Sequence, residues 1–311
     1  GGFTSYDEHY QKNETTLKED ALSDRWESRG SKVAVVSKEK ADNNDYPEAK
    51  EVLLVNNTKN KVIVSQKVFD QAYPASTTKI MTALLTLENL NLSQVVTIKH
   101  DITFPDGAAV AIHLKKGDKI TVEALLNALI IMSANDAAVA LGEAVAGSEA
   151  NFVKMMNKRA KELGMNDTNF VNCHGLDEDD HLTSAYDIAL MSRELLTKHP
   201  RATNYATIWS GSRRDGKSAL SNTNKLVRNY SGCTGLKTGS TSKALFNLSA
   251  SATRNDLSLI SVIMKAPTSA IRFSNASTLL DYGFNTFSYK SFATKGEVFK
   301  IHITFVITFK I

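Results

Sequence analysis

The order in which strand-like and helix-like segments alternate constrains the fold of this chain more than any other feature. Two short apolar runs, at 52–55 and 62–64, are typical of strands and flank a polar turn at 56–60. Two longer strand-like runs, at 244–252 and 257–265, follow only after a mostly helical stretch. We therefore predict a mixed α/β (α+β) fold in which strands from both chain ends form one antiparallel sheet. Helices should flank this sheet, and the helical block should be an inserted all-helical subdomain.

Hydrophobic periodicity predicts six helices. The segment 76–90 is apolar over a wide stripe, which indicates a helix that is buried on most sides. Four more helices are predicted at 122–132, 136–146, 149–163 and 184–197. A terminal helix at 269–282 should end at Gly283, and a tight turn at 254–256 should join the two late strands.

The chain divides into three parts. Residues 1–46 are rich in Asp, Glu, Lys and Asn, and we expect a poorly ordered or loosely docked N-terminal extension there. Residues 47–287 contain the predicted sheet and helices and should form one large domain. Residues 288–311 alternate apolar and polar positions, which favours the start of an incomplete β-rich segment.

Composition excludes several classes of function. The net charge of the 311 residues is +4, and no basic cluster is interleaved with aromatic residues, so nothing favours nucleic-acid binding. No run of 18 apolar residues predicts a membrane span, and no signal peptide is present at the start of the sequence. The spacing of Cys173 and Cys233 fits no metal site, and whether they form a disulfide stays open. No two histidines have the His-x-x-x-His spacing, so we expect no metal and no cofactor.

Three short motifs occur in a fixed order along the chain: Ser76-Thr77-Thr78-Lys79, Ser133-Ala134-Asn135 and Lys237-Thr238-Gly239. Each one alone has a structural explanation, such as a helix cap, a junction between helices or a surface turn. The Ser-x-x-Lys spacing also occurs at Ser37 and Ser240, but only Ser76 begins a long apolar segment. Together the motifs indicate a serine acyl-transfer enzyme that acts on peptide or lactam carbonyls.

The first motif provides a nucleophile and a base. Residues three apart share one face of a helix, so the Ser76 hydroxyl and the Lys79 amine should be in contact. A lysine with its ordinary pKa of about 10.4 would stay protonated at neutral pH and could not accept the serine proton. We expect burial, the positive end of the helix dipole and a second cation, such as Lys237, to lower the Lys79 pKa.

The other two motifs provide proton transfer and substrate binding. Ser133 could pass a proton to the leaving amine, and the Asn135 amide could hold both Lys79 and the substrate backbone. Lys237 and Thr238 could bind a substrate carboxylate.

Close approach of the substrate is the expected role of Gly239, because glycine has no side chain to obstruct it. The backbone amides of Ser76 and Ser240 are candidates for the oxyanion hole.

Longer segments around these motifs resemble the low-molecular-mass penicillin-binding proteins, which are serine-type D-Ala-D-Ala carboxypeptidases. The similarity covers about residues 47–287 and is carried by 73–83, 174–177, 222–224, 235–241 and 279–284. It implies a penicillin-binding/β-lactamase-like fold. It also implies that Ser76 is acylated, that Lys79 is its base, that Ser133 and Asn135 act beside them, and that 237–240 bind substrate. Arg272 resembles an arginine that the family keeps near the substrate carboxylate.

The resemblance also implies partners and a location. The substrate would be a peptidoglycan stem peptide ending in D-Ala-D-Ala, and β-lactam antibiotics would trap the serine. The enzyme would act outside the cytoplasm, as a secreted protein or on the outer face of the bacterial cytoplasmic membrane. Family members continue into a complete β-rich domain and a membrane anchor, where this sequence has only residues 288–311. Membrane-surface association through such a region is therefore possible.

Three alternatives stay open to different degrees. A D,D-endopeptidase acting on peptidoglycan cross-links would use the same residues. A non-catalytic module that binds penicillin or peptidoglycan would not need an intact Ser76 and Lys79. A class A β-lactamase is disfavoured, because no Glu-x-x-x-Asn pattern begins in a predicted loop after the second motif. The candidate Glu194 lies in a predicted helix and is followed four residues later by Lys198.

Overall fold

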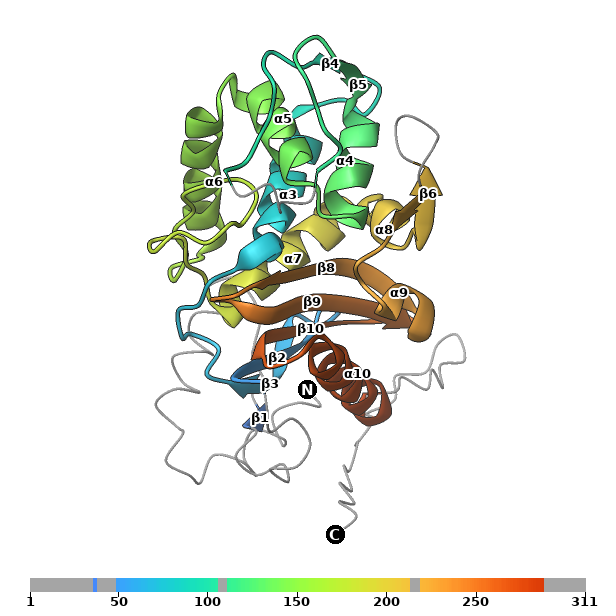
Figure 1. The fold of residues 1–311 in the computed structure, drawn as a ribbon. Helices are drawn as coiled ribbons and strands as arrows, with labels where there is room; N and C mark the ends of the chain where they lie inside the picture. The colour runs from blue at the N-terminus through green and yellow to red at the C-terminus, as the bar shows by residue number, and fades with distance from the viewer. Residues whose placement is uncertain (1–35, 38–48, 106–110, 213–218, 288–311) are drawn as a thin grey trace, which may run out of the picture.

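A six-stranded sheet with the strand order β1-β3-β2-β10-β9-β8 forms the centre of the fold (Figure 1). The structure, a computed structural model, describes residues 36–37, 49–105, 111–212 and 219–287. Its strands are β1 (Val36–Ser37), β2 (Glu51–Asn56), β3 (Lys61–Gln66), β8 (Cys233–Thr241), β9 (Leu245–Arg254) and β10 (Leu257–Ala266). Two small sheets pair β4 (Val95–Thr97) with β5 (Lys119–Thr121) and β6 (Ser210–Ser212) with β7 (Ala219–Ser221).

The described helices comprise one 3₁₀ turn and eight α-helices. They are η2 (Ala75–Thr78), α3 (Lys79–Asn89), α4 (Val122–Ile131), α5 (Asn135–Ala146), α6 (Glu149–Leu163), α7 (Ala185–Lys198), α8 (Ala202–Ala206), α9 (Leu226–Asn229) and α10 (Ser269–Thr286). Among the described residues, no helix is long and apolar enough to cross a membrane.

The sheet is built from both ends of the domain, as the sequence predicted. Val55 of β2 lies opposite Ile260 of β10 in an antiparallel ladder, and β9 and β8 continue this ladder to the edge. Among the strands that the structure describes, only β1 pairs in parallel, with Val36 opposite Val64 of β3. Apart from β1, the predicted N-terminal extension lies outside the described residues, as does the predicted β-rich segment at 288–311.

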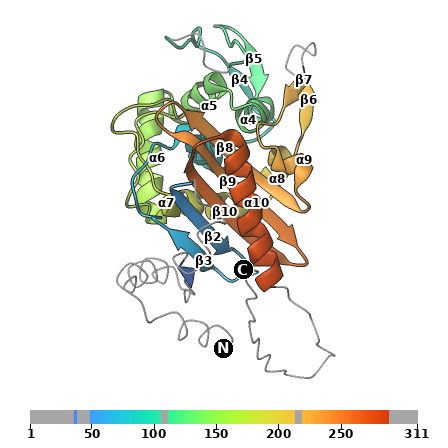
Figure 2. The same ribbon diagram turned by 60° about the horizontal axis from the view of Figure 1, so that its bottom comes forward.

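Helices cover both faces of the sheet, and the alternation of side chains in β2 matches this arrangement. Leu53 and Val55 belong to the core shared with α3 and α7, whereas Val52 and Leu54 belong to the core under α10. Figure 2 shows α10 lying across the sheet, and α7 contacts the strands as well. Because both faces are covered, β2 is buried along its whole length.

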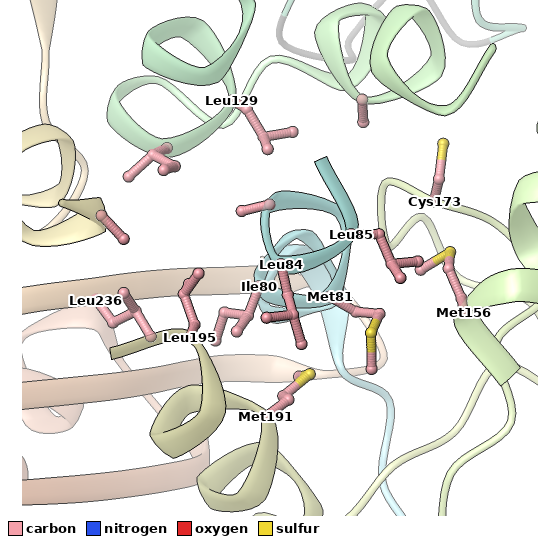
Figure 3. Close-up of a cluster of buried hydrophobic side chains, with 14 of the residues drawn as sticks. Ile80, Met81, Leu84, Leu85, Leu129, Met156, Cys173, Met191, Leu195 and Leu236 are labelled. Carbon is pink, nitrogen blue, oxygen red and sulfur yellow. The ribbon is translucent and has the colours of Figure 1, made fainter. Parts of the chain in front are cut away.

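Helix α3 lies at the centre of the larger core, which confirms that the predicted stripe belongs to a helix buried on most sides. Figure 3 shows its side chains Ile80, Met81, Leu84 and Leu85 among residues from four other elements. These are Leu129 of α4, Met156 of α6, Met191 and Leu195 of α7, and Leu236 of β8. Each such buried side chain contributes roughly 1.5–3 kcal/mol to folding. This packing fixes the first residue of α3, Lys79, against the sheet edge.

Two predicted boundaries are wrong for identifiable reasons. The helical segment beginning at Ser76 opens as the 3₁₀ turn η2, and regular α-helix begins only at Lys79. Helix α10 continues through Gly283 to Thr286. Gly283 serves close packing instead of helix termination, because a Cβ there would lie 2.5 Å from Leu259 Cδ1.

Glu51 of β2 gives a testable prediction for stability. Its side chain is buried, neither carboxylate oxygen has a hydrogen-bond partner among the described residues, and burial raises its pKa from 4.5 to about 7. The folded state therefore holds this proton more tightly than the unfolded state, so stability falls as pH rises from about 4.5 to 7. Glu51→Gln should therefore raise the free energy of unfolding at pH 8 by as much as about 3 kcal/mol more than it does at pH 4.5.

Urea unfolding of both proteins at pH 4.5 and pH 8 measures this difference. The exposed Glu123 of α4, changed to Gln, serves as the control. An equal effect of Glu51→Gln at both pH values would contradict the assignment.

Candidate active site

The turn that carries Ser76 has an unusual backbone. Ala75, which is fully buried, has a φ of +49°, in the left-handed region that side-chain-bearing residues rarely adopt. Thr77 Oγ1 donates to Pro74 O at 2.6 Å and closes the turn from inside. The turn therefore presents a half-exposed Ser76 immediately before the buried helix α3. We call residues 73–76 the nucleophile turn.

Lys79 is buried and makes three short hydrogen bonds. Its Nζ lies 2.8 Å from Ser76 Oγ, 2.7 Å from Asn135 Oδ1 and 2.7 Å from the carbonyl oxygen of His174. Burial lowers the pKa of Lys79 to about 7. The Asn135 and His174 oxygens can only accept, so a neutral amine would donate its two protons to them. Its lone pair would then face the Ser76 hydroxyl, which is the geometry that a base needs.

Of the influences expected to lower the Lys79 pKa, the second cation does not act on this residue. Burial is the cause that lowers it, and Lys79 is indeed the first residue of α3. The charge of a neighbouring cation instead lowers the pKa of Lys237. The pKa of Lys237 is well below its ordinary value because of burial first and then the charges of Lys79 and Arg272.

The Ser133-Ala134-Asn135 motif joins α4 to α5 and supplies no side-chain cap to α5. The N-cap of α5 is Ala134, and neither Ser133 nor Asn135 supplies the side-chain hydrogen bond that a helix cap would make. Ser133 has a φ of +62°, and its buried Oγ has no hydrogen-bond partner within the described part of the chain. A strained residue with an unsatisfied hydroxyl is typical of a functional site.

The third motif lies inside β8, which begins at Cys233. Strand β8 is the edge of the sheet that faces the helical block (Figure 1). Lys237 is buried, and its Nζ donates to Thr238 O at 2.9 Å. Thr238 Oγ1 pairs with Thr223 Oγ1 at 2.6 Å, and Ser240 is exposed.

Gly239 has a packing role that the sequence did not indicate. A Cβ at this position would lie 2.7 Å from Ser76 N and 2.8 Å from Thr77 N. The missing side chain therefore lets the nucleophile turn itself pack against β8. The expected close approach of the substrate backbone stays a prediction. This contact sets the distance between the third motif and Ser76.

The Arg272 side chain of α10 contacts backbone carbonyls of both β8 and β9. Its Nη1 donates to Asn247 O at 3.3 Å and lies 3.5 Å from Gly239 O, and its guanidinium lies over the Phe273 ring, 4.8 Å from the centroid. Burial lowers its pKa to about 10, so the side chain stays cationic at neutral pH. Its charge also contributes to the lowered pKa of Lys237, which places the two cations near each other.

The sequence missed the loop that holds Lys79. The His174 carbonyl accepts from Lys79, and Asn172 Oδ1 accepts from the amides of His174 and Gly175, at 3.2 and 2.7 Å, and so shapes the turn. Only the resemblance of residues 174–177 to a family segment pointed here, because a backbone carbonyl has no sequence signature. His174 itself stays neutral, since burial and then the Lys79 charge lower its pKa to about 3.

The structure answers two questions that the sequence left open, the pairing of the cysteines and the role of Glu194. Cys173 and Cys233 are both free, so they form no disulfide. Glu194 lies in α7 and pairs with Arg159 of α6 at 3.0 Å, which gives it a structural role between helices. It therefore does not supply the deacylating glutamate of a β-lactamase.

Comparison with known proteins gives a consistent result. The family model described as D-alanyl-D-alanine carboxypeptidase matches residues 38–268. The chain is 38% identical over 246 residues to D-alanyl-D-alanine carboxypeptidase DacF of Bacillus subtilis, covering 77% of this chain and 63% of the relative. It is 35% identical over 250 residues to DacC of Escherichia coli, covering 77% of this chain and 62% of the relative.

A solved structure agrees with this result. The cefotaxime-bound penicillin-binding protein D2 of Listeria monocytogenes matches with a TM-score of 0.69 and 31% identity, over 76% of this chain and 97% of that one. The chain thus spans less than two thirds of the length of the two curated relatives and nearly all of the solved structure.

Proposed function

Because this chain belongs to the D-alanyl-D-alanine carboxypeptidase family, we propose that it removes the terminal D-Ala of peptidoglycan stem peptides through an acyl-enzyme on Ser76. The observation that carries this proposal is the contact between the buried amine of Lys79 and Ser76 Oγ, at 2.8 Å. A buried lysine with a pKa of about 7 is a competent base at neutral pH.

The first half-reaction forms the acyl-enzyme. Ser76 Oγ attacks the carbonyl carbon of the penultimate D-Ala, and its proton passes to Lys79 Nζ. The C–N bond then breaks, and the leaving D-Ala nitrogen takes up a proton from Lys79 through the hydroxyl of Ser133. The backbone amides of Ser76 and Ser240 are the oxyanion donors in this proposal.

Water completes the cycle. It attacks the ester on Ser76, the C–Oγ bond breaks, and the shortened peptide leaves with a free carboxylate while the hydroxyl is restored. In the bound substrate, Lys237, Thr238 and Arg272 would hold the terminal carboxylate, and Asn135 with the backbone at Gly239 would hold the peptide. Cations that are buried close together, as Lys237 and Arg272 are, favour an anionic ligand.

The site would also react with β-lactams, whose strained amide resembles the scissile bond. Because peptidoglycan lies outside the cytoplasmic membrane, we place the reaction there. Attachment to the membrane surface stays a prediction, because the region at 288–311 lies outside the described residues.

Release of free D-Ala from a pentapeptide ending in D-Ala-D-Ala tests the proposal, with a cross-linked muropeptide dimer as the competing substrate. The proposal requires D-Ala release from the pentapeptide. Cleavage of the dimer alone would favour the endopeptidase alternative, and no cleavage with reversible penicillin binding would favour a binding module.

The pH dependence of acylation gives a further prediction. The neutral fraction of Lys79 rises tenfold per pH unit below its pKa of about 7 and levels off above it. The rate constant for acylation by benzylpenicillin should therefore climb up to about pH 7 and then reach a plateau. Stopped-flow measurements between pH 5 and 10 provide the profile. A rate that still climbs tenfold per unit above pH 9 would show that Lys79 keeps its ordinary pKa.

A further inference from the structure

Asn247 of β9 is a fully buried amide that the reaction scheme does not use, and all its hydrogen-bonding groups are occupied. Its Nδ2 donates to Tyr73 O at 2.9 Å and to Pro74 O at 3.1 Å, and its Oδ1 accepts from Lys265 N at 3.0 Å. Two carbonyls on one side and an N–H on the other leave only one orientation of the amide that satisfies every partner. Asn247 thus connects two segments that are far apart in sequence.

The first of these segments is a bulge in β10. Leu248 lies opposite Ile263 and Phe246 lies opposite Ala266, so Met264 and Lys265 together face the single residue Asn247. Lys265 has a φ of +57°, and its N–H points to the side chain of Asn247. Bulges of this kind are common beside active sites, where they redirect a group from the regular ladder.

The second segment is the nucleophile turn. Tyr73 and Pro74, whose carbonyls accept from Asn247, come directly before Ala75, the residue with the left-handed backbone. Such a conformation costs about 1–3 kcal/mol and persists only where the surroundings impose it. Asn247 also lies opposite Gly239 in the β8–β9 ladder, and Gly239 is the residue that packs against Ser76 N.

We propose that Asn247 is a positioning residue that holds the nucleophile turn in its left-handed conformation and thereby aims Ser76 Oγ at Lys79 and the substrate. It anchors the turn to the β10 bulge, and its amide hydrogen-bonds to neither Lys79 nor Ser76. The expected effect of Asn247 on the acylation rate rests on the proposed function. Its expected effect on the conformation of the nucleophile turn does not.

The test compares Asn247→Ala and Asn247→Asp with the control Asn157→Ala. The aspartate keeps the acceptor for Lys265 N but faces the Tyr73 and Pro74 carbonyls with a carboxylate, so it breaks only the bonds to the turn. Asn157 of α6 bridges the backbone N–H and carbonyl of Phe170 at 2.8 Å, so its variant also loses amide-to-backbone bonds, away from the turn.

Stopped-flow acylation by a fluorescent penicillin separates positioning from general destabilisation. Both Asn247 variants should lower the limiting acylation rate constant by about 10²-fold, the effect of a displacement of about 1 Å, with the concentration for half-maximal rate within about threefold of the original. Asn157→Ala should retain the limiting rate within about threefold, although its thermal unfolding temperature falls. Limiting rates in the Asn247 variants equal to that of the control would overturn the proposal.

Amide hydrogen exchange of residues 70–80 provides a readout that does not depend on activity. Exchange in this segment should be faster in both Asn247 variants than in Asn157→Ala. If the unmutated protein is not acylated, the proposed function fails, and this comparison alone decides the role of Asn247. Unchanged exchange would then contradict it.

Discussion

Ser76→Ala should abolish D-Ala release and covalent penicillin binding, with a loss of activity of about 10⁴-fold or more. Within the described residues, the Ser76 side chain hydrogen-bonds only to Lys79 Nζ, so its removal takes away the nucleophile and leaves the packing of α3 intact. Thermal unfolding of the variant should therefore stay within about 3 °C of the original. D-Ala release and thermal unfolding, measured on the same preparation, test both parts of this expectation.

The control for this variant is Ser210→Ala. Ser210 lies exposed in β6, in a different sheet from the third motif, and its loss should leave D-Ala release unchanged. Residual carboxypeptidase activity of more than about 1% in Ser76→Ala would mean that another group forms the acyl-enzyme.

Gly175→Ala should be the most disruptive single substitution next to the site. Gly175 has a φ of +101°, and a Cβ there would lie 1.9 Å from Ala75 O and 2.3 Å from Ala75 C, both backbone atoms of the nucleophile turn. Backbone atoms cannot move aside as a flexible side chain can, so the turn or the loop must shift. We expect a loss of more than about 4 kcal/mol of folding free energy, which lowers the unfolding temperature by about 10 °C or more.

Gly117→Ala separates the clash from the backbone strain. Gly117 has a similar φ of +89°, but a Cβ there would meet nothing within 4 Å. This variant should lose only about 1–2 kcal/mol from the left-handed conformation. Equal destabilisation of the two variants, measured by urea unfolding, would contradict the close packing of Gly175 against Ala75.

Residues whose side chains do the chemistry could be found from the sequence. The Ser76 and Lys79 side chains meet because three residues on a helical turn share one face, and Asn135 reaches the same amine as expected. Long elements were also predictable. Helix α6 begins and ends at the predicted residues, and each end of α7 lies one residue from its predicted position. Their apolar periodicity extends over three or more turns, so tertiary contacts reinforce it.

Features that depend on the backbone were not predictable. The His174 carbonyl that holds Lys79 carries no residue-type signal, and the left-handed conformations of Ala75 and Ser133 are imposed by packing. The short strands β4 to β7 span three residues each, too few for a periodic pattern. The packing role of Gly239 was not predictable either, because the sequence could not show that the nucleophile turn lies against it.

The most direct test of the account is intact-mass measurement over time after addition of benzylpenicillin, followed by peptide mapping of the adduct. The account predicts a mass increase equal to one benzylpenicillin molecule, located on the peptide that contains Ser76 and absent from Ser76→Ala. Because Glu194 pairs with Arg159 and so supplies no deacylating glutamate, the adduct should persist. An adduct on another residue, or rapid recovery of unmodified protein with hydrolysed penicillin, would contradict it.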